Sequence, residues 1–147
     1  MKPIQFSIYG LIIGLIALVP FVPIFSMMPG VGIALGIGKL IGECEFGYVI
    51  TNWLLLFIAA TNVILFIKKV DKLLETKKYV FLWFCLWSLP YYFCVNFIAL
   101  TLVAGIKASC YGDGQIIFYL IYSTPIAAFC QLLFGIIVDI RNYMKRK

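Results

Sequence analysis

The residues that could carry chemistry in this chain are five cysteines, and the sequence contains no histidine. Cys85, Cys94 and Cys130 lie inside long apolar stretches, whereas Cys44 and Cys110 lie between such stretches. Two thiols on the exported, oxidising side of a membrane can form a disulfide, which typically stabilises a fold by about 2–4 kcal/mol. We therefore expect a disulfide between Cys44 and Cys110. The alternative is that both are unpaired because their Cα atoms lie too far apart.

Thiol redox chemistry is the enzymatic activity that such cysteines could perform. Small four-helix membrane oxidoreductases that form disulfides or reduce vitamin K also present exported cysteines, and this chain resembles them in architecture alone. Those enzymes use a reactive C-x-x-C dithiol, and this sequence has no C-x-x-C. Without histidine, zinc and haem lose their usual nitrogen ligand. We predict a protein that is not an enzyme and has no cofactor and no metal site.

The apolar stretches are long enough to cross a bilayer. The chain has 147 residues, of which 64% are hydrophobic and 12% charged, against about 45–50% and 25% in soluble domains. About 18 apolar residues cross the hydrocarbon as a helix, which satisfies its own backbone polar groups. Four stretches qualify, at about residues 4–28, 48–67, 79–106 and 116–140. We predict a single all-α membrane domain over residues 1–147, built as a four-transmembrane-helix bundle.

The positions of lysine and arginine predict the orientation, because short cytosolic loops retain positive charge. Basic residues gather before the first stretch, in residues 68–78 and in the tail at residues 141–147, whereas residues 29–47 and 107–115 hold one lysine each. We therefore expect a cytosolic loop at 68–78, exported loops at 29–47 and 107–115, and both termini in the cytosol. This N-in/C-in protein would lie in an inner, or plasma, membrane. The net charge of +6 then reflects topology, and no nucleic-acid recognition motif accompanies it.

The first predicted exported loop is unusual because it is rich in glycine and yet apolar. Its glycine spacing fits neither phosphate-binding pattern, G-x-x-x-x-G-K-[ST] or G-x-G-x-x-G. An apolar segment of about a dozen residues is also too short to span a bilayer. We expect this segment to lie in the outer membrane interface as a broken helix.

Polar side chains inside the stretches need partners in hydrocarbon. They are amides and hydroxyls rather than charges, and the candidates are Asn52, Asn62, Asn96, Gln131, Ser123 and Thr124. Counting 1.5 Å per residue places Asn52 level with Asn96, and Gln131 level with the region from Ser88 to Tyr91. We expect interhelical hydrogen bonds at these levels, of about 0.6–2 kcal/mol each. The alternative is a polar groove that binds a ligand or partner.

Small residues and prolines govern how the predicted helices pack. Gly10 and Gly14 form a G-x-x-x-G step, which allows close backbone approach either inside the bundle or between two copies. Prolines in the first, third and fourth stretches each remove a backbone donor, so we expect kinked helices. The hydroxyls of Ser123 and Thr124 precede Pro125 and could satisfy a carbonyl that this proline frees.

The third stretch is crowded with aromatic residues. Tyr79, Trp83 and Trp87 recur on one helical face, and the first two suit the membrane interface. Trp87, Tyr91 and Tyr92 run deeper, where they either fill the bundle or face the hydrophobic helix of another protein. We take Trp83, Trp87, Tyr91 and Tyr92 as candidate partner-facing aromatics.

The size, the four helices, the N-in/C-in orientation and the short exported loops together resemble the small polytopic immunity proteins that protect bacteria from pore-forming colicins and similar toxins. The resemblance covers the whole chain and rests on form rather than on a motif. It implies a non-enzymatic protein that neutralises a toxin by helix-to-helix contact in the bilayer. One alternative is a small subunit or assembly factor of a membrane complex. Another is an oligomeric channel or transporter, or a thiol-redox membrane protein. The expected partners are the bilayer, a membrane-embedded protein, and further copies of this chain.

Overall fold

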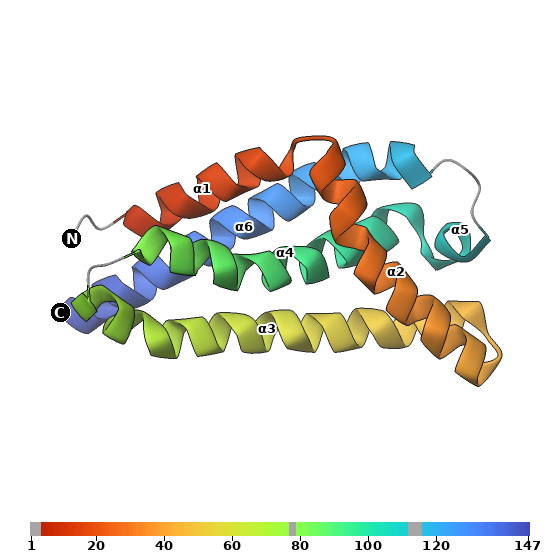
Figure 1. Cartoon of the computed structure of the whole chain (residues 1–147), viewed down its shortest axis with the longest axis horizontal. Helices are drawn as coiled ribbons and strands as arrows, with labels where there is room; N and C mark the ends of the chain where they lie inside the picture. Colours follow the sequence, from red (N-terminus) through yellow and green to blue (C-terminus); the bar gives the residue numbers. More distant parts are fainter. Residues whose placement is uncertain (1–3, 77–78, 112–115) are drawn as a thin grey trace.

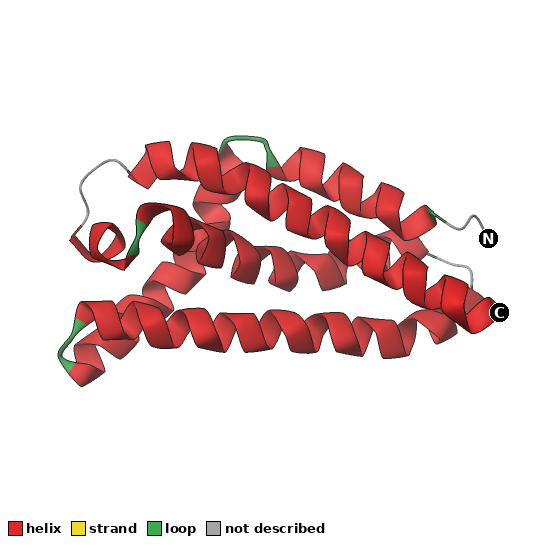
Figure 2. Ribbon diagram, turned by 180° about the vertical axis from the view of Figure 1, so that it is seen from behind, coloured by secondary structure: helices red, strands yellow, loops and turns green. Residues whose placement is uncertain are grey.

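The computed structural model describes residues 4–76, 79–111 and 116–147, and these residues are helical almost throughout (Figure 1, Figure 2). They form six helices: α1 Gln5–Ala17, α2 Phe21–Ile41, α3 Cys44–Thr76, α4 Val80–Ala104, α5 Ile106–Tyr111 and α6 Ile116–Arg146. Four of these, α2, α3, α4 and α6, are long and apolar enough to cross a membrane. The prediction of an all-α protein with four candidate membrane-spanning helices is therefore confirmed.

The first predicted span, residues 4–28, consists of two helices rather than one. α1 ends at Ala17, after which the amides of Leu18 and Val19 bond to carbonyls three residues earlier. α2 begins after Pro20, which suits a helix start because the amide that it lacks would be unpaired there. In Figure 1, α1 runs beside α6, and α2 then crosses obliquely to the start of α3. The first passage along the bundle is thus shared between α1 and α2.

The glycine-rich segment at residues 29–47, predicted as an exported loop that contains a broken helix, is largely helical because α2 and α3 extend into it. α2 continues through it to Ile41, where Gly42 ends the helix with a φ of 87°, a conformation that glycine adopts without steric cost. Small residues spaced four apart explain why this stretch stays helical, since they give α2 a flat side against which another helix can pack. This α2 stripe comprises Ser26, Gly30, Ala34 and Gly38, all of them buried.

Ala34 and Gly38 of the α2 stripe pack directly against the start of α3, whereas Ser26 and Gly30 face Asn96 and Phe97 on α4. A Cβ added at Gly47 would lie 2.6 Å from the amide nitrogen of Gly38 and 2.8 Å from its Cα atom, and it would also meet the carbonyl oxygen of Ala34. At these distances a methyl group would not fit, so only the hydrogen atom of a glycine can occupy this position. The backbones of α2 and α3 therefore touch, and the two helices form a tight hairpin.

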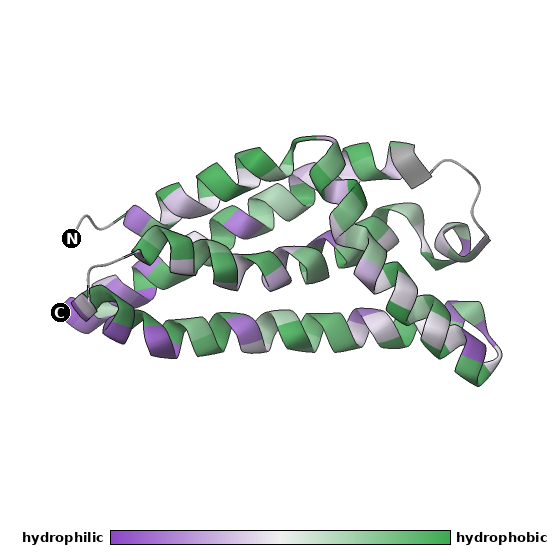
Figure 3. Cartoon of the chain, viewed as in Figure 1, coloured by the Kyte–Doolittle hydropathy of each residue, from purple (hydrophilic) through white to green (hydrophobic). Residues whose placement is uncertain are grey.

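The other two predicted loops are shorter in the structure because helices extend into them. α3 continues through the charged residues of the predicted loop 68–78 as far as Thr76. The predicted loop 107–115 contains α5, which follows Gly105. Residues 77–78 and 112–115 of these loops lie outside the described residues. Hydrophilic residues gather at the two ends of the bundle (Figure 3), so the helices extend beyond their apolar parts at both ends.

α1 and α6 run antiparallel in close contact (Figure 1). A Cβ added at Gly10 would lie 2.5 Å from the carbonyl oxygen of Gln131, and one at Gly14 would lie 2.9 Å from that of Ala128. Gly135 on α6 faces the backbone of α1 in the same way. The predicted packing step therefore has its partner within the chain. We call Gly10, Gly14 and Gly135 the α1–α6 seam.

Four phenylalanines fill the end of the bundle that carries both termini. Phe6, Phe66, Phe84 and Phe134 come from α1, α3, α4 and α6, and all four are fully buried. Their contacting ring centroids lie 5.2 to 6.0 Å apart, within the range that aromatic pairs prefer. This core fixes the four helices relative to one another.

Asp139 caps α1 from the neighbouring helix α6. It is 8% exposed, and its carboxylate accepts hydrogen bonds from the amide of Phe6 at 3.1 Å, the amide of Ser7 at 2.7 Å and the hydroxyl of Ser7 at 2.6 Å. Amides in a first helical turn lack partners within the helix, and a carboxylate there also opposes the helix dipole. The cap therefore ties the start of α1 to α6.

Substitution of this cap has a measurable consequence. We expect Asp139→Ala to destabilise the protein by about 1–3 kcal/mol, because three buried or half-buried donors lose a charged acceptor. Asp139→Asn retains one acceptor oxygen and should cost less. Thermal unfolding of the purified protein in detergent measures both effects. An Asp139→Ala protein that unfolds at the wild-type temperature would show that the cap contributes nothing.

Candidate functional site

The structure contains a lateral groove between α3 and α6, with α4 behind it. α3 and α6 each pack mainly against α4, and they meet each other at one end of the bundle, through Phe66 with Phe134 and Asp71 with Arg141. Figure 2 shows α4 between them. The groove encloses about 500 Å³. Its lining is almost wholly apolar and comprises Leu56, Ala59, Ala60, Val63, Ile64, Tyr91, Val95, Ile98, Ala99, Leu102, Ile126, Cys130 and Ile137.

Small side chains make the lateral groove accessible to a helix. Ala59 and Ala60 lie on α3 and Ala99 lies on α4. Small residues on a helix face allow another helix to approach closely in a membrane. Ala60 is exposed, whereas Ala59 and Ala99 are buried. The groove therefore suits an apolar side chain from a neighbouring membrane helix, both in size and in polarity.

The four candidate partner-facing aromatics do not share one face. Tyr91 lines the lateral groove, and its hydroxyl donates to the carbonyl of Cys130 at 3.1 Å. Tyr92 is buried, and its hydroxyl donates to a carbonyl at the end of α1 at 3.4 Å. Trp83 and Trp87 line a different hollow, between α3 and α4. Tyr91 is thus the one member of the set that belongs to the lateral groove.

The predicted polar positions mostly hold helices together. Asn96 is fully buried, and its amide nitrogen donates to the carbonyl of Pro23 at 3.0 Å and to the hydroxyl of Ser26 at 2.7 Å. Asn52 accepts a hydrogen bond from the hydroxyl of Thr101 at 2.9 Å. Asn52 and Asn96 therefore do not pair as predicted, because α2 crosses α4 at this level and supplies the partners of Asn96.

The amide oxygens of Asn62, Asn96 and Gln131 are buried without a hydrogen-bond partner among the described residues. The nitrogen of Gln131 donates to the carbonyl of Ser88 at 3.3 Å, in the region that its depth predicts. Asn62 lies on α3 beside Trp87, where both line a small hollow. An unpaired buried amide oxygen is costly, and of the three it is that of Asn62, beside a hollow, that is placed to accept a hydrogen bond from a bound group.

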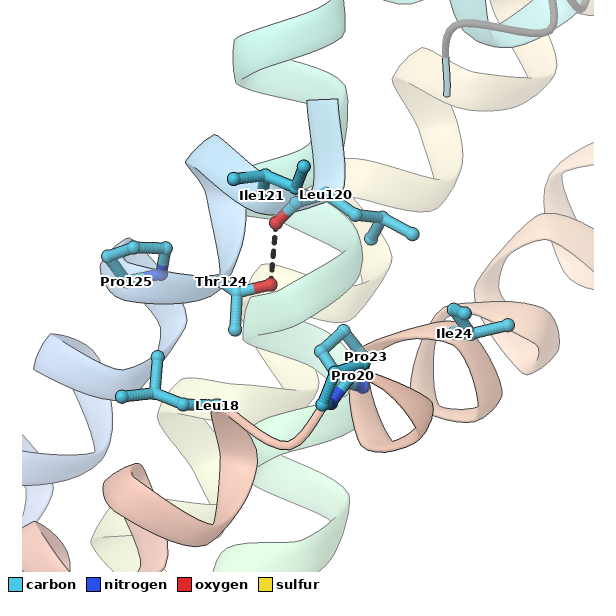
Figure 4. Close-up of a pocket in the computed structure, with 8 residues that line it drawn as sticks. All are labelled: Leu18, Pro20, Pro23, Ile24, Leu120, Ile121, Thr124 and Pro125. Atoms are coloured by element: carbon cyan, nitrogen blue, oxygen red, sulfur yellow. Dashed lines mark hydrogen bonds between the residues drawn. The ribbon is translucent and has the colours of Figure 1, made fainter. Parts of the chain in front are cut away.

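Ser123 and Thr124 both donate to the carbonyl of Leu120, at 3.3 and 2.5 Å. The carbonyl that Pro125 frees belongs to the next residue, so these hydroxyls do not replace the lost bond as predicted. Figure 4 shows Thr124 and Pro125 beside a hollow of about 240 Å³ at the junction of α1 and α2. The hydroxyl of Thr124 is already engaged within α6, which leaves this hollow with an apolar character.

Cys44 and Cys110 form a disulfide whose Cα atoms lie 5.9 Å apart, so the predicted pairing is confirmed. The bond joins the first residue of α3 to α5. Beside it, the buried Tyr48 hydroxyl donates to the carbonyl of Ser109 at 3.2 Å. The remaining cysteines are free, namely Cys85, Cys94 and Cys130. The described residues contain no group of three or more side chains placed to hold a metal ion.

An ionic cluster lies at the end of the bundle that carries both termini. Arg141 on α6 donates to both carboxylate oxygens of Asp71 on α3, at 2.5 and 2.7 Å, and Lys145 also bonds to Asp71. Exposed ion pairs typically contribute about 0.2–1 kcal/mol. The cluster therefore links α3 to α6 beyond one end of the lateral groove without closing the groove itself.

The alanines of the lateral groove are not among the residues that the sequence analysis singled out. Ala59 and Ala60 interrupt a run of bulky side chains, Leu-Leu-Leu-Phe-Ile, in the predicted second span. Paired small residues within such a run indicate a place where another helix can approach. That pattern is the signal that could have identified this wall of the groove. The opposite wall depends on how α6 packs, and the sequence carries no comparable signal for it.

Comparisons of the chain with protein-family models, with curated proteins and with solved structures each find no match. The candidate site is therefore characterised by its geometry: an apolar lateral groove, a disulfide at one end of the bundle, and an ionic cluster at the other.

Proposed function

We propose that this chain is a non-enzymatic membrane interaction protein that receives the apolar helix of a membrane-embedded partner protein in its lateral groove. The observation that supports the proposal is the lateral groove itself, which lies between α3 and α6 and has α4 as its floor. Helices in lipid associate through close packing, because lipid tails are as apolar as the helices. A concave surface with alanines in its wall offers a partner helix more contact than a convex helix face does.

The proposed location is an inner, or plasma, membrane, with both termini in the cytosol. The start of α1, the end of α3, the start of α4 and the end of α6 lie at the same end of the bundle (Figure 1). Basic residues gather there, including Lys68, Lys69 and Lys72 on α3 and Lys145 and Arg146 on α6. Positive charge of this kind is typical of cytosolic segments.

Within this class, the function that we favour is immunity to a pore-forming toxin. Such a toxin inserts an apolar helical hairpin into the bilayer, and a preformed lateral groove would hold one of its helices before a pore forms. A subunit or assembly factor of a membrane complex is the second candidate, since it would use the same groove for a permanent partner. The two candidates differ in whether the bound protein is a toxin or a resident protein.

The test fills the lateral groove. Ala60→Trp places an indole in the groove without entering the buried core, because Ala60 is exposed. Leu54→Trp is the matched control, an exposed position on α3 outside the groove. In a host sensitive to a panel of pore-forming toxins, we expect the wild type and Leu54→Trp to protect against at least one toxin. Ala60→Trp should lose about tenfold or more of that protection, as expected for the loss of roughly 1.4 kcal/mol of binding.

Three outcomes distinguish the candidates. Unchanged survival with the wild type across the panel, together with no toxin that co-purifies, would contradict immunity. A resident membrane protein that co-purifies with the wild type and is lost from Ala60→Trp would identify a complex subunit. Wild-type behaviour of Ala60→Trp in both assays, at equal membrane abundance, would contradict the groove as the binding surface.

A further inference from the structure

A second groove opens between α3 and α4 at the end of the bundle that carries both termini. It encloses about 400 Å³ and is lined by Lys69, Lys72, Leu73, Thr76, Trp83 and Trp87. Trp87 also lines a hollow of about 230 Å³ further along the same two helices, with Phe57, Ile58, Thr61, Asn62 and Leu65. We call the two together the basic-aromatic groove.

Along its length the basic-aromatic groove changes from charged to mostly apolar, as one membrane leaflet does from its headgroups to its acyl chains. The α3 side of the groove from Phe57 to Lys69 covers about 18 Å at 1.5 Å per residue. One half of the hydrocarbon core is roughly 15 Å thick. The deep end is lined mainly by large apolar side chains, with the polar Thr61 and Asn62 among them. The other end holds two lysines and Trp83, whose ring type favours the membrane interface.

Neighbouring carboxylates do not neutralise the two lysines of this groove. Among the residues that the structure describes, the ion pairs all involve Asp71, whose partners are Arg141 and Lys145. The Nζ atom of Lys69 lies instead 5.1 Å from the ring centroid of Trp87. This cation–π contact orients the ammonium group without cancelling its charge. The groove therefore presents positive charge at its mouth and a mostly apolar track behind it.

From this arrangement we infer that the basic-aromatic groove binds one anionic glycerophospholipid of the adjacent leaflet. The phosphate lies between Lys69 and Lys72, and one acyl chain follows the track from Leu65 to Phe57. Lysines at a membrane surface attract anionic lipid individually, so two of them give a preference of about tenfold or more over a zwitterionic lipid. This inference rests on the membrane-spanning helices and not on the proposed partner of the lateral groove.

The experiment uses the full-length protein purified from bilayers that contain phosphatidylglycerol and phosphatidylcholine with identical acyl chains. Native mass spectrometry counts the lipids that each protein retains. The wild type is expected to retain one phosphatidylglycerol with about tenfold preference or more. Lys69→Gln/Lys72→Gln is expected to lose this preference. Lys68→Gln/Lys147→Gln, which has the same net charge but leaves the groove lysines in place, is expected to keep it.

A second variant tests the acyl-chain track separately from the charges. Leu65→Trp blocks the track and keeps both groove lysines, so it should lose the retained lipid, whereas Leu54→Trp should not. Equal losses in the two lysine variants would show attraction to surface charge only and would overturn the inference. If inorganic phosphate alone raised the unfolding temperature of the protein as much as phosphatidylglycerol does, that result would also overturn the inference. None of these measurements depends on a protein partner. A negative result for lipid binding is therefore distinguishable from a negative result for the proposed function.

Discussion

Gly135→Ala is expected to lower the unfolding temperature of the protein, whereas Gly36→Ala is expected to leave it unchanged or to raise it. A Cβ at Gly135 would lie 2.7 Å from the carbonyl carbon of Phe6 and 3.0 Å from the Cα atom of Ser7, and it would also collide with the carbonyl oxygen of Phe6. Relief requires α1 and α6 to move apart, and overpacking of this kind costs about 1–3 kcal/mol. At Gly36, the described structure has no such neighbour within 4 Å.

The comparison of these two variants isolates packing from helix propensity. Both replace a helical glycine by alanine, which favours the helix by about 1 kcal/mol. Thermal unfolding in detergent, followed by circular dichroism, measures the difference between them. Gly10→Ala should behave like Gly135→Ala because it lies on the opposite side of the α1–α6 seam. Equal unfolding temperatures for Gly135→Ala and Gly36→Ala would show that α1 does not pack on α6 in this way.

Loss of the Cys44–Cys110 disulfide is expected to destabilise the protein by about 2–4 kcal/mol. The two cysteines are separated by 66 positions, and the segment between them contains α3 and α4. Without the bond, the unfolded chain gains conformational freedom, so the folded state loses stability relative to it. We expect Cys44→Ser and Cys110→Ser to unfold at similarly lowered temperatures, and the double variant to be no worse than either.

Gel mobility without reductant provides the direct check on this bond. The native protein should migrate differently from Cys44→Ser and from the reduced wild type. Cys85→Ser is the control, because Cys85 is a free cysteine and its loss should leave mobility unchanged. Identical mobility of the native protein and Cys44→Ser, with both thiols open to alkylation before reduction, would rule the disulfide out.

Hydropathy predicts α3, α4 and α6 because a long uncharged run has one stable form in lipid, the helix. It does not predict the break between α1 and α2, since apolar residues continue almost unbroken through Leu18 and Pro20. The glycine content predicts a broken helix in an exported loop at residues 29–47, where the structure has the continuous second half of α2. The regular spacing of the α2 stripe, from Ser26 to Gly38, is the pattern that indicates a packed helix instead.

The polar contacts follow from depth only in part. Depth places Gln131 beside Ser88, and the structure has that hydrogen bond. Depth also places Asn52 beside Asn96, but it gives neither the rotation of a helix nor the oblique course of α2. Counting residues along each span does not predict the cap at Asp139, because its partners lie 132 and 133 positions earlier in the chain.

The lateral groove itself depends on which helices do not pack together. Every long helix of this chain is apolar on most of its surface, so the sequence alone does not say that α3 and α6 leave α4 uncovered between them. The positions of Ala59 and Ala60 become meaningful only when this arrangement is known. Binding surfaces of membrane proteins are in this respect harder to predict than their spans.

The proposed function depends on the proposed topology, in which four membrane crossings leave both termini in the cytosol. Reporters that distinguish cytosol from the exported side can be fused at Lys147 and inserted after Lys78 and after Gly42. The proposed topology predicts a cytosolic signal at Lys147 and Lys78 and an exported signal at Gly42, which precedes the opposite end of α3. An exported signal at Lys147 or Lys78, or a cytosolic signal at Gly42, would contradict it.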